Sequence, residues 1–378
     1  MTMTPKERVY AAVQHREADR VPVGEAYVDY PVIEAVLGRQ TYYRSHAREV
    51  QAHWEGRRDE VVAGQKRDLV EFVRRTGLDI LPVWQVPPRN RVVEAPRRLT
   101  TDTWEDRDGN ILRLVPETEE FVVAQAGAAV AEPLEQPPPD GSQWELWDHV
   151  VEELGETHFL IASAGPSLGI SDYRPTDIDG RFDRFAAWMQ RIADDPDGIA
   201  EAETERLEGF RDTVADLAAR GLDAVRISPD YGYGRTTYCS PAAFRRAFLP
   251  GLRKMCDEVH AGGLLLHFHC DANMQDLTDV MVEAGVDIYQ SIEPHEPIER
   301  YKRDVGDSVT LWGGVSCGDL CTEDPDEIRR QARYAIEHCA SGGGFILGSS
   351  HNIMLSARPE NFRAMLEVAF QEGEYPRG

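Results

Sequence analysis

The second half of the chain repeats one pattern, in which an amphipathic stretch precedes a short run of apolar residues. In the longer stretches the apolar residues recur three and four positions apart, which is typical of helices that bury one face. The short runs are apolar throughout and rich in β-branched residues, as expected of parallel strands buried on both faces. The predicted helices are 197–220, 240–261, 273–285, 297–307, 324–344 and 358–372, and the predicted strands are 222–228, 264–268, 286–292, 309–314 and 345–350.

Three apolar runs in the first half, at 20–27, 78–84 and 158–165, bring the number of predicted strands to eight. Neighbouring parallel strands need crossover connections, so the pattern leaves a doubly wound sheet or a barrel. Eight strand–helix units favour the barrel. We therefore predict an α/β protein with a (β/α)8 TIM-barrel fold that forms a single domain over residues 1–378.

Residues 87–150 interrupt this rhythm. Two proline-rich stretches flank a segment in which Asp108-Gly109 separates two alternating runs, the pattern of a hairpin. We predict an inserted β-ribbon with linkers between the second and third strands. A rim or lid over the barrel mouth and a structural or dimer-forming role are both consistent with it.

Charge and composition narrow the function classes. The chain has 41 Lys and Arg against 66 Asp and Glu, a formal charge of −25, which disfavours a nucleic-acid partner. No apolar run is long enough to span a membrane, and the first twenty residues are charged, so we expect no membrane partner and a cytoplasmic location. The six cysteines contain no C-x-x-C, which predicts neither a disulfide framework nor a zinc ribbon.

Catalytic residues of such barrels lie at the carboxyl ends of the strands. The residues at these positions are unusually polar and aromatic, and they suit a small-molecule substrate. Arg235 suits a substrate carboxylate, because a guanidinium can bind one with two hydrogen bonds. The predicted substrate-binding residues are Glu25, Trp84, Tyr231, Arg235, Gln290 and Trp312.

The run LHFHCDAN at the end of the fifth strand is the sharpest local signal for a metal. His267 and His269 are two residues apart, so both point to the same side of a strand. Glu293 and His351, at the ends of two other strands, can complete a site of four ligands. Cys270 is an alternative ligand or nucleophile. The histidines can instead bind substrate carboxylates, contact each other, or lie in the core.

The loop after the fourth strand, SPDYGYGRTTYC, carries a second set of candidates. Asp230 and Tyr233 can act as an acid/base pair, with His351 as a third catalytic group. A capping turn, in which Asp230 binds backbone amides, is the alternative.

These segments resemble the uroporphyrinogen decarboxylase superfamily. The resemblance is carried by TPKERVYAAVQHREADRVPV at the start, by the loop after the fourth strand, and by LHFHCDANMQDL and GGGFILGSSHNIM. It covers residues 4–30 and 150–375 and implies a (β/α)8 barrel. Decarboxylation of uroporphyrinogen itself is not expected. The chain lacks the N-terminal arginines of the true decarboxylases, and Val83 and Trp84 stand where those enzymes have an aspartate.

The methyltransferase branch of the superfamily binds zinc through H-x-C, often a glutamate, and a last cysteine. By this resemblance His267 matches the histidine, His269 and His351 replace the cysteines, and Glu293 matches the glutamate; a different register places Cys270 at the first cysteine. A divalent metal is implied, zinc or another first-row metal, because imidazoles favour zinc less strongly than thiolates do. The branch also implies a corrinoid or tetrahydrofolate as co-substrate, and homodimers are common in the family.

These observations predict a metal-dependent methyltransferase or demethylase that moves a methyl group through a corrinoid protein or a folate. Three alternatives stay open. One is a metal-independent decarboxylase or lyase on a carboxylated substrate, which would use Asp230, Tyr233 and His351. A second is a hydrolase that uses metal-bound hydroxide. The third is a corrinoid- or ligand-binding protein without catalytic activity.

Overall fold

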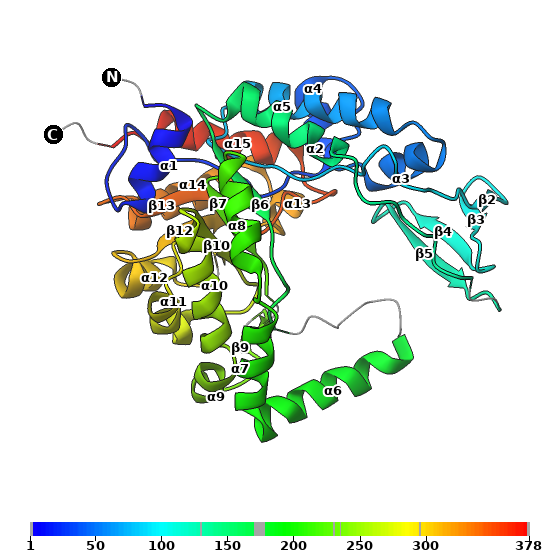
Figure 1. Cartoon of the computed structure of the whole chain (residues 1–378). Coiled ribbons are helices and arrows are strands. Elements are labelled where there is room, and N and C mark those ends of the chain that lie inside the picture. Colours follow the sequence, from blue (N-terminus) through cyan, green and yellow to red (C-terminus); the bar gives the residue numbers. More distant parts are fainter. Residues whose placement is uncertain are drawn as a thin grey trace.

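The computed structural model describes residues 3–128, 131–169, 178–229, 231–234, 236–294 and 296–375, without the side chains of 178–184 and 233 (Figure 1). Its largest sheet has seven strands, all parallel to their neighbours. In sheet order they are β1 (Ile80–Pro82), β6 (Phe159–Ser163), β7 (Ala224–Ile227), β10 (Leu265–His269), β11 (Ile288–Ile292), β12 (Thr310–Val315) and β13 (Phe345–Ser349). Each lies at a predicted strand.

The segment around Val23 and Gly24 lies between the two edge strands of this sheet. Val23 forms a single parallel bridge with Leu347 of β13, and Gly24 forms one with Ile80 of β1. Pro22 has no amide hydrogen to donate, so this segment does not form a regular ladder. The bridges to both edges give the sheet the curl of a TIM barrel, although the first predicted strand is not a strand of regular length.

The backbone of the segment around Gly24 approaches β1 and β13 closely. A Cβ placed on Gly24 would lie 2.9 Å from the Ile80 side chain, and one on Gly348 would collide with the Gly24 carbonyl oxygen. We expect Gly348→Ala to lower the free energy of unfolding by about 1–3 kcal/mol, because a rigid backbone atom must move. Urea denaturation tests this, with Gly318→Ala as the control, since its added Cβ makes only ordinary contact. Equal stability of the two variants would contradict this packing.

The inside of the barrel changes from apolar to polar along the strands. One buried cluster joins Val9 and Ala12 of α1 to strand residues that include Ile161, Ala224 and Ile288. Side chains alternate between the two faces of a strand. The next inward positions after Ile161, Ala224 and Ile288 are therefore Ser163, Arg226 and Gln290. The polar end is the carboxyl end, where barrel enzymes place their sites.

Helices cover the outside of the sheet. The predicted helix 197–220 divides at Gly209, which has a positive φ of 75°, and the predicted helix 240–261 divides just before Pro250. The helices are α1 (Pro5–Val13), α2 (Tyr30–Leu37), α3 (His46–Trp54), α4 (Arg58–Thr76), α5 (Glu145–Leu154), α6 (Ile178–Asp194), α7 (Pro196–Glu205), α8 (Phe210–Ala219), α9 (Pro241–Ala247), α10 (Leu249–Ala261), α11 (Thr278–Ala284), α12 (Ile298–Val305), α13 (Asp319–Thr322), α14 (Pro325–Cys339) and α15 (Pro359–Gln371), with 3-10 turns η1 (Ser142–Trp144) and η2 (Gln275–Leu277). No helix of the described residues is long and apolar enough to cross a membrane.

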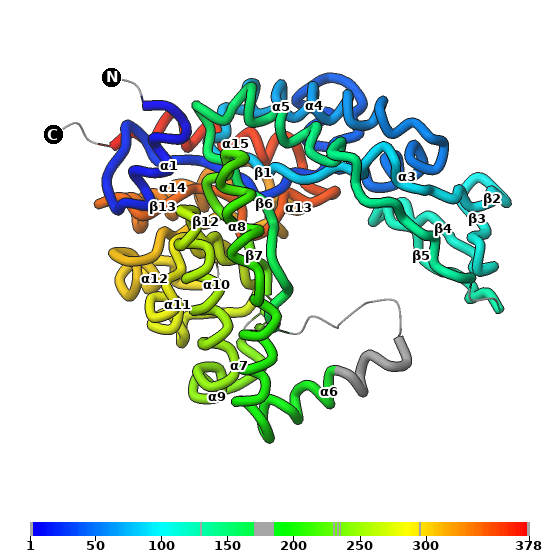
Figure 2. The backbone as a smooth tube through the Cα atoms, in the orientation of Figure 1, coloured from blue at the N-terminus to red at the C-terminus, as the bar shows by residue number. Residues whose placement is uncertain are grey.

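A separate antiparallel sheet follows β1 along the chain and extends away from the barrel (Figures 1 and 2). Asp106 holds the turn between its second and third strands, because its carboxylate accepts hydrogen bonds from the backbone N–H groups of Asp108 and Asn110. Trp54 of α3 contacts this sheet through Trp104 and Phe121. The strands are β2 (Arg97–Arg98), β3 (Thr103–Glu105), β4 (Ile111–Val115) and β5 (Glu120–Gln125); two short strands, β8 (Gly232–Tyr233) and β9 (Thr236–Thr237), form a third sheet.

Candidate functional site

Three side chains of the types that bind metals meet at the carboxyl ends of β10 and β13. One donor atom from each of His269, Asp271 and His351 lies within 4.8 Å of the other two. His269 Nε2 is 3.2 Å from Asp271 Oδ1, and His351 Nε2 is 3.8 Å from Asp271 Oδ2. We call these three residues the His-Asp-His group. Two imidazoles and one carboxylate are a ligand set that zinc and iron both accept.

Neighbouring side chains fix the orientation and charge of this group. Gln290 Oε1 lies 3.1 Å from His269 Nδ1, which leaves Nε2 facing Asp271, and Ser291 Oγ donates to Asp271 Oδ1 at 3.3 Å. Burial lowers the pKa of His269. Burial would raise the pKa of Asp271, but the neighbouring His269 and His351, when protonated, outweigh it and lower this pKa to about 2. A neutral imidazole and a carboxylate are the forms that bind a metal.

The backbone is strained beside the group. Ser291 has a φ of 113°, and the register between β11 and β12 shifts between Gln290 and Ile292. A bulge of this kind redirects side chains at the end of a strand, and such strain often accompanies a functional site. It places Gln290 beside His269 and Ser291 beside Asp271.

His267 lies inside the barrel next to the group, fully buried. Its ring packs on Trp312 with centroids 4.7 Å apart, and neither ring nitrogen forms a well-aligned hydrogen bond with a described residue, although the Gln290 amide approaches the ring. Burial, and then the charge of Arg226, lower its pKa well below the ordinary value. Buried polar atoms are seldom left unpaired, so this neutral imidazole is available to a ligand.

The other predicted ligands lie outside the group. Glu293 accepts hydrogen bonds from Ser350 Oγ at 2.6 Å and from Cys317 Sγ at 3.7 Å. Cys270 is buried in the main core rather than in the barrel interior. Of the four predicted ligands, the structure therefore brings His269 and His351 together, and Asp271 is the third member that sequence analysis did not select.

The predicted acid/base residues are only partly described. Asp230 and Arg235 lie outside the described residues, and for Tyr233 only the backbone is described. Their roles remain predictions. Tyr231, a predicted substrate-binding residue, packs between Phe244 and Phe248 with ring centroids 4.9 Å from each and is buried. This position is in the main hydrophobic core rather than at the barrel mouth.

Three further predicted substrate-binding residues, Trp312, Trp84 and Gln290, contact other side chains or the backbone of the protein. Trp312 is fully buried beneath His267, and its Nε1 donates to the Gly24 carbonyl at 3.1 Å, so it does not line the mouth as predicted. Trp84 is half-buried and stacks on Tyr43 at 5.3 Å. Gln290 supports His269. The aromatic residues were selected by their position after a strand, which does not fix the depth of a side chain.

Glu25, the remaining predicted substrate-binding residue, connects the closing segment of the barrel to the site. One carboxyl oxygen accepts from Ser349 N at 2.8 Å, and the other contacts Ser349 Oγ at 2.5 Å. The same hydroxyl also donates to the carbonyl of His351. A serine hydroxyl has one proton, so both contacts are satisfied when Glu25 is protonated and donates. Glu25 thus positions the backbone of His351.

The protonation of Glu25 predicts a pH dependence. Burial raises its pKa from 4.5 to about 8, against the hydrogen bonds from Ser349. The folded protein then holds this proton more tightly than the unfolded chain, so its stabilisation is complete below about pH 4 and is lost as the pH rises towards 8. We expect the unfolding free energy of chelator-treated protein to fall over this range, by up to about 1.4 kcal/mol per pH unit. Glu25→Gln should flatten the decline in urea denaturation; an unchanged slope would contradict the assignment.

Sequence analysis also passed over Arg226 of β7. It is 8% exposed and lies in the strand pattern Ala-Val-Arg-Ile, next to His267 in the sheet register. A charged residue within an otherwise apolar strand is the signal that could have identified it.

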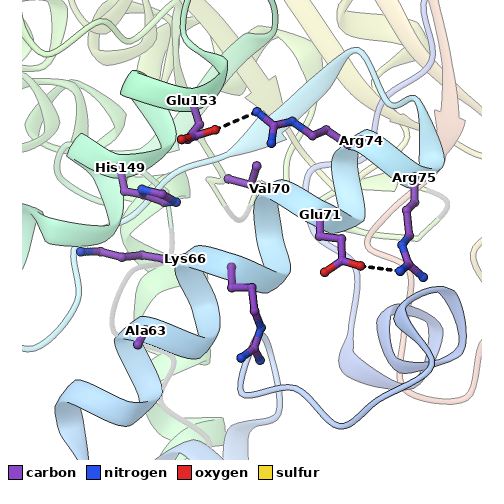
Figure 3. Close-up of a pocket in the computed structure, with 9 residues that line it drawn as sticks. Ala63, Lys66, Val70, Glu71, Arg74, Arg75, His149 and Glu153 are labelled. Atoms are coloured by element: carbon purple, nitrogen blue, oxygen red, sulfur yellow. Dashed lines mark hydrogen bonds and ion pairs between the residues drawn. The ribbon is translucent and has the colours of Figure 1, made fainter.

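A groove with several basic side chains lies outside the barrel, between α4 and α5 (Figure 3). Its volume is about 690 Å³. Arg74 pairs with Glu153 at 2.8 Å, and Arg75 pairs with Glu71 at 2.5 Å. Three of its four Lys and Arg side chains, Arg67, Arg74 and Arg75, thus have carboxylate partners, and the groove contains none of the predicted site residues.

Comparison with known proteins identifies the family. Residues 150–371 match the family model of uroporphyrinogen decarboxylase (URO-D). No curated protein matches the sequence. Among solved structures, a methyltransferase from Methanosarcina mazei aligns over 98% of this chain and 99% of its own, with 16% identity and a TM-score of 0.63. A protein from Listeria monocytogenes described as a vitamin-B12-independent methionine synthase aligns over 92% and 96%, with 11% identity and a TM-score of 0.46.

The family model covers more than half of the chain. It includes six of the seven strands of the large sheet, and β1 lies outside it. It also includes the whole His-Asp-His group. The likeness to the methyltransferase supports the same fold over nearly the entire length. The chain therefore belongs to the uroporphyrinogen decarboxylase family.

Proposed function

We propose that the protein is a metal-dependent methyltransferase or demethylase that moves a methyl group between a small-molecule substrate and a corrinoid protein or a folate. The observation that carries this proposal is the His-Asp-His group at the carboxyl ends of β10 and β13. Membership of the family and the likeness in fold to a methyltransferase support methyl transfer as the chemistry.

The residues fit a divalent metal. His269 and His351 offer imidazole nitrogens, and Asp271 offers a carboxylate oxygen, within the spacing that one ion requires. His267 adds a buried imidazole that forms no well-aligned hydrogen bond with a described residue. Three protein ligands leave a coordination position for a substrate. Zinc is the first candidate, and the absence of sulfur from this donor set leaves other first-row metals open.

When bound, the metal would act as a Lewis acid and lower the pKa of a substrate thiol or hydroxyl. The chain's own residues orient and shield this site. Gln290 fixes the ring of His269, Ser291 holds Asp271, and Glu25 positions His351 through Ser349. Apolar residues exclude water from the half of the barrel interior at the amino ends of the strands. We propose Asp230 and Tyr233 as the acid/base pair.

The proposal is tested anaerobically with methylcob(III)alamin as donor and 2-mercaptoethanol as acceptor. The thiol loses its proton, its sulfur bonds to the methyl carbon, and the Co–C bond breaks with both electrons left on cobalt, which gives a thioether and cob(I)alamin. We expect zinc-loaded protein to accelerate the appearance of the cob(I)alamin spectrum and chelator-treated protein not to do so. No zinc-dependent change with either this donor or methyltetrahydrofolate would contradict the proposal.

A hydrolase that uses metal-bound hydroxide is the second candidate, favoured by the oxygen and nitrogen donors of the group. It predicts zinc-dependent hydrolysis of an activated ester such as p-nitrophenyl acetate and no change in methylcob(III)alamin. A metal-free lyase predicts release of CO2 from carboxylated substrates in the presence of chelator.

A further inference from the structure

Arg226 lies inside the barrel on β7, at the level where the interior becomes polar. Its backbone pairs in register with Ser163 of β6 on one side and with His267 of β10 on the other. The residue is 8% exposed. Its side chain therefore belongs to the same inward layer as His267, two residues before His269 on the neighbouring strand.

The guanidinium of Arg226 has no hydrogen bond or ion pair with any described residue. Its Nε is buried and unpaired, and its guanidinium lies over the Tyr27 ring, 5.6 Å from Cζ to the ring centroid. Arg8, which is 5% exposed, differs: it pairs with Asp19 and Asp79, both at 2.6 Å. Among the described residues, carboxylates thus pair with Arg8 and not with Arg226.

An unpaired buried charge is costly, because the charge loses its hydration without gaining an opposite charge. Burial accordingly lowers the pKa of Arg226, and the nearby Asp271 only partly offsets this effect without contacting it. Arginine nevertheless keeps its proton in proteins. Such a residue is expected where a ligand brings the missing negative charge.

The surroundings of Arg226 suit an anion. Tyr27 and Ser163 are joined by a hydrogen bond of 3.2 Å between their hydroxyl oxygens. Ser163 is exposed although the rest of β6 is buried, so this point of the barrel wall is open to solvent. Arg226, Tyr27 and Ser163 together form what we call the anion site.

We propose that the anion site binds a carboxylate of the substrate, with the Arg226 guanidinium as the principal donor and the hydroxyls of Tyr27 and Ser163 as further donors. The planar guanidinium matches a carboxylate with two parallel hydrogen bonds. This inference adds a substrate class to the proposed function, and it rests on that function for the metal at which the substrate reacts. Two residues along a strand span about 7 Å, so the substrate is a small molecule with its carboxylate a few bonds from the atom that reacts at the metal.

Binding to chelator-treated protein tests the anion site independently of the metal. Propionate, the neutral propionamide and ethanesulfonate are titrated at equal ionic strength by calorimetry. We expect wild type to bind propionate best, and Arg226→Met to bind it at least about 10-fold more weakly, the range of a charge-assisted hydrogen-bond pair. Arg74→Met, in the groove of Figure 3, is the matched control and should retain wild-type affinity.

A second readout separates binding from a structural role. Without ligand, Arg226→Met should have an unchanged or higher Tm, because it removes an unpaired buried charge. A lower Tm together with unchanged propionate affinity would overturn the proposal, as would equal binding of propionate and propionamide by wild type. Tighter binding of ethanesulfonate would overturn the choice of a carboxylate. If wild-type protein binds propionate but does not bind a metal, the proposed function is contradicted and the anion site is not.

Discussion

The His269→Ala variant is expected to lose stoichiometric zinc and to lose methyl transfer with it. Only Asp271 and His351 of the group remain in this variant, and two protein ligands rarely hold a catalytic zinc. Changes to supporting residues alone cost about 10–100-fold in metal affinity, so loss of a ligand should exceed about 100-fold. Elemental analysis after dialysis measures the zinc, and the anaerobic cobalamin assay measures the activity.

His338→Ala is the matched control for this experiment. His338 lies on the exposed side of α14, where its ring stacks on Tyr334, and it does not belong to the His-Asp-His group. This variant should bind one zinc ion like wild type. A His269→Ala protein that stays folded and keeps its zinc would show that the His-Asp-His group is not the metal site. His267→Ala then distinguishes a three-ligand site, which keeps zinc, from one that also uses His267.

The Asp79→Ala variant should be strongly destabilised, by about 3–5 kcal/mol. Asp79 is fully buried directly before β1. Its carboxylate accepts from Arg8 at 2.6 Å, from Arg20 at 2.7 Å, and from the backbone of Val23 at 2.8 Å. It thereby ties α1 and the closing segment to the first strand of the sheet. Removing it leaves two arginines and one amide without this partner.

Urea denaturation of Asp79→Ala and Asp59→Ala provides the comparison. Asp59 also pairs with two arginines, Arg58 and Arg89, but its side chain is 67% exposed. Surface pairs contribute little, so this control should lose less than about 1 kcal/mol. Similar losses of unfolding free energy in both variants would mean that Asp79 does not stabilise the contact between the closing segment and β1.

The fold could be predicted because parallel strands buried on both faces leave a continuous apolar pattern. That pattern is plain in FILGS of β13 and ILP of β1. It is weaker where the chain closes the barrel, since Pro22 cannot donate to a ladder and Val23 and Gly24 form single bridges. Helix boundaries were less predictable, because Gly209 and Pro250 divide stretches that keep a helical apolar period.

The site could be predicted only in part, for a different reason. The alternation of side chains along a strand predicts that His267 and His269 point to the same side. It does not predict how deep in the barrel each side chain lies. His267 is covered by the packing on Trp312, whereas His269 reaches the rim and meets Asp271. The bulge at Ser291 has no sequence signal. Arg226 has a sequence signal, a charge within an apolar strand, but its lack of a carboxylate partner among the described residues is visible only in the structure.

X-ray absorption spectroscopy of the zinc-loaded protein tests directly whether the His-Asp-His group binds the metal. We expect one zinc per chain with nitrogen and oxygen donors at about 2.0–2.2 Å and no sulfur, because the group consists of imidazoles and a carboxylate. Adding 2-mercaptoethanol should introduce one sulfur at about 2.3 Å. Failure to bind stoichiometric zinc, or a sulfur ligand before any thiol is added, would show that this group is not the metal site.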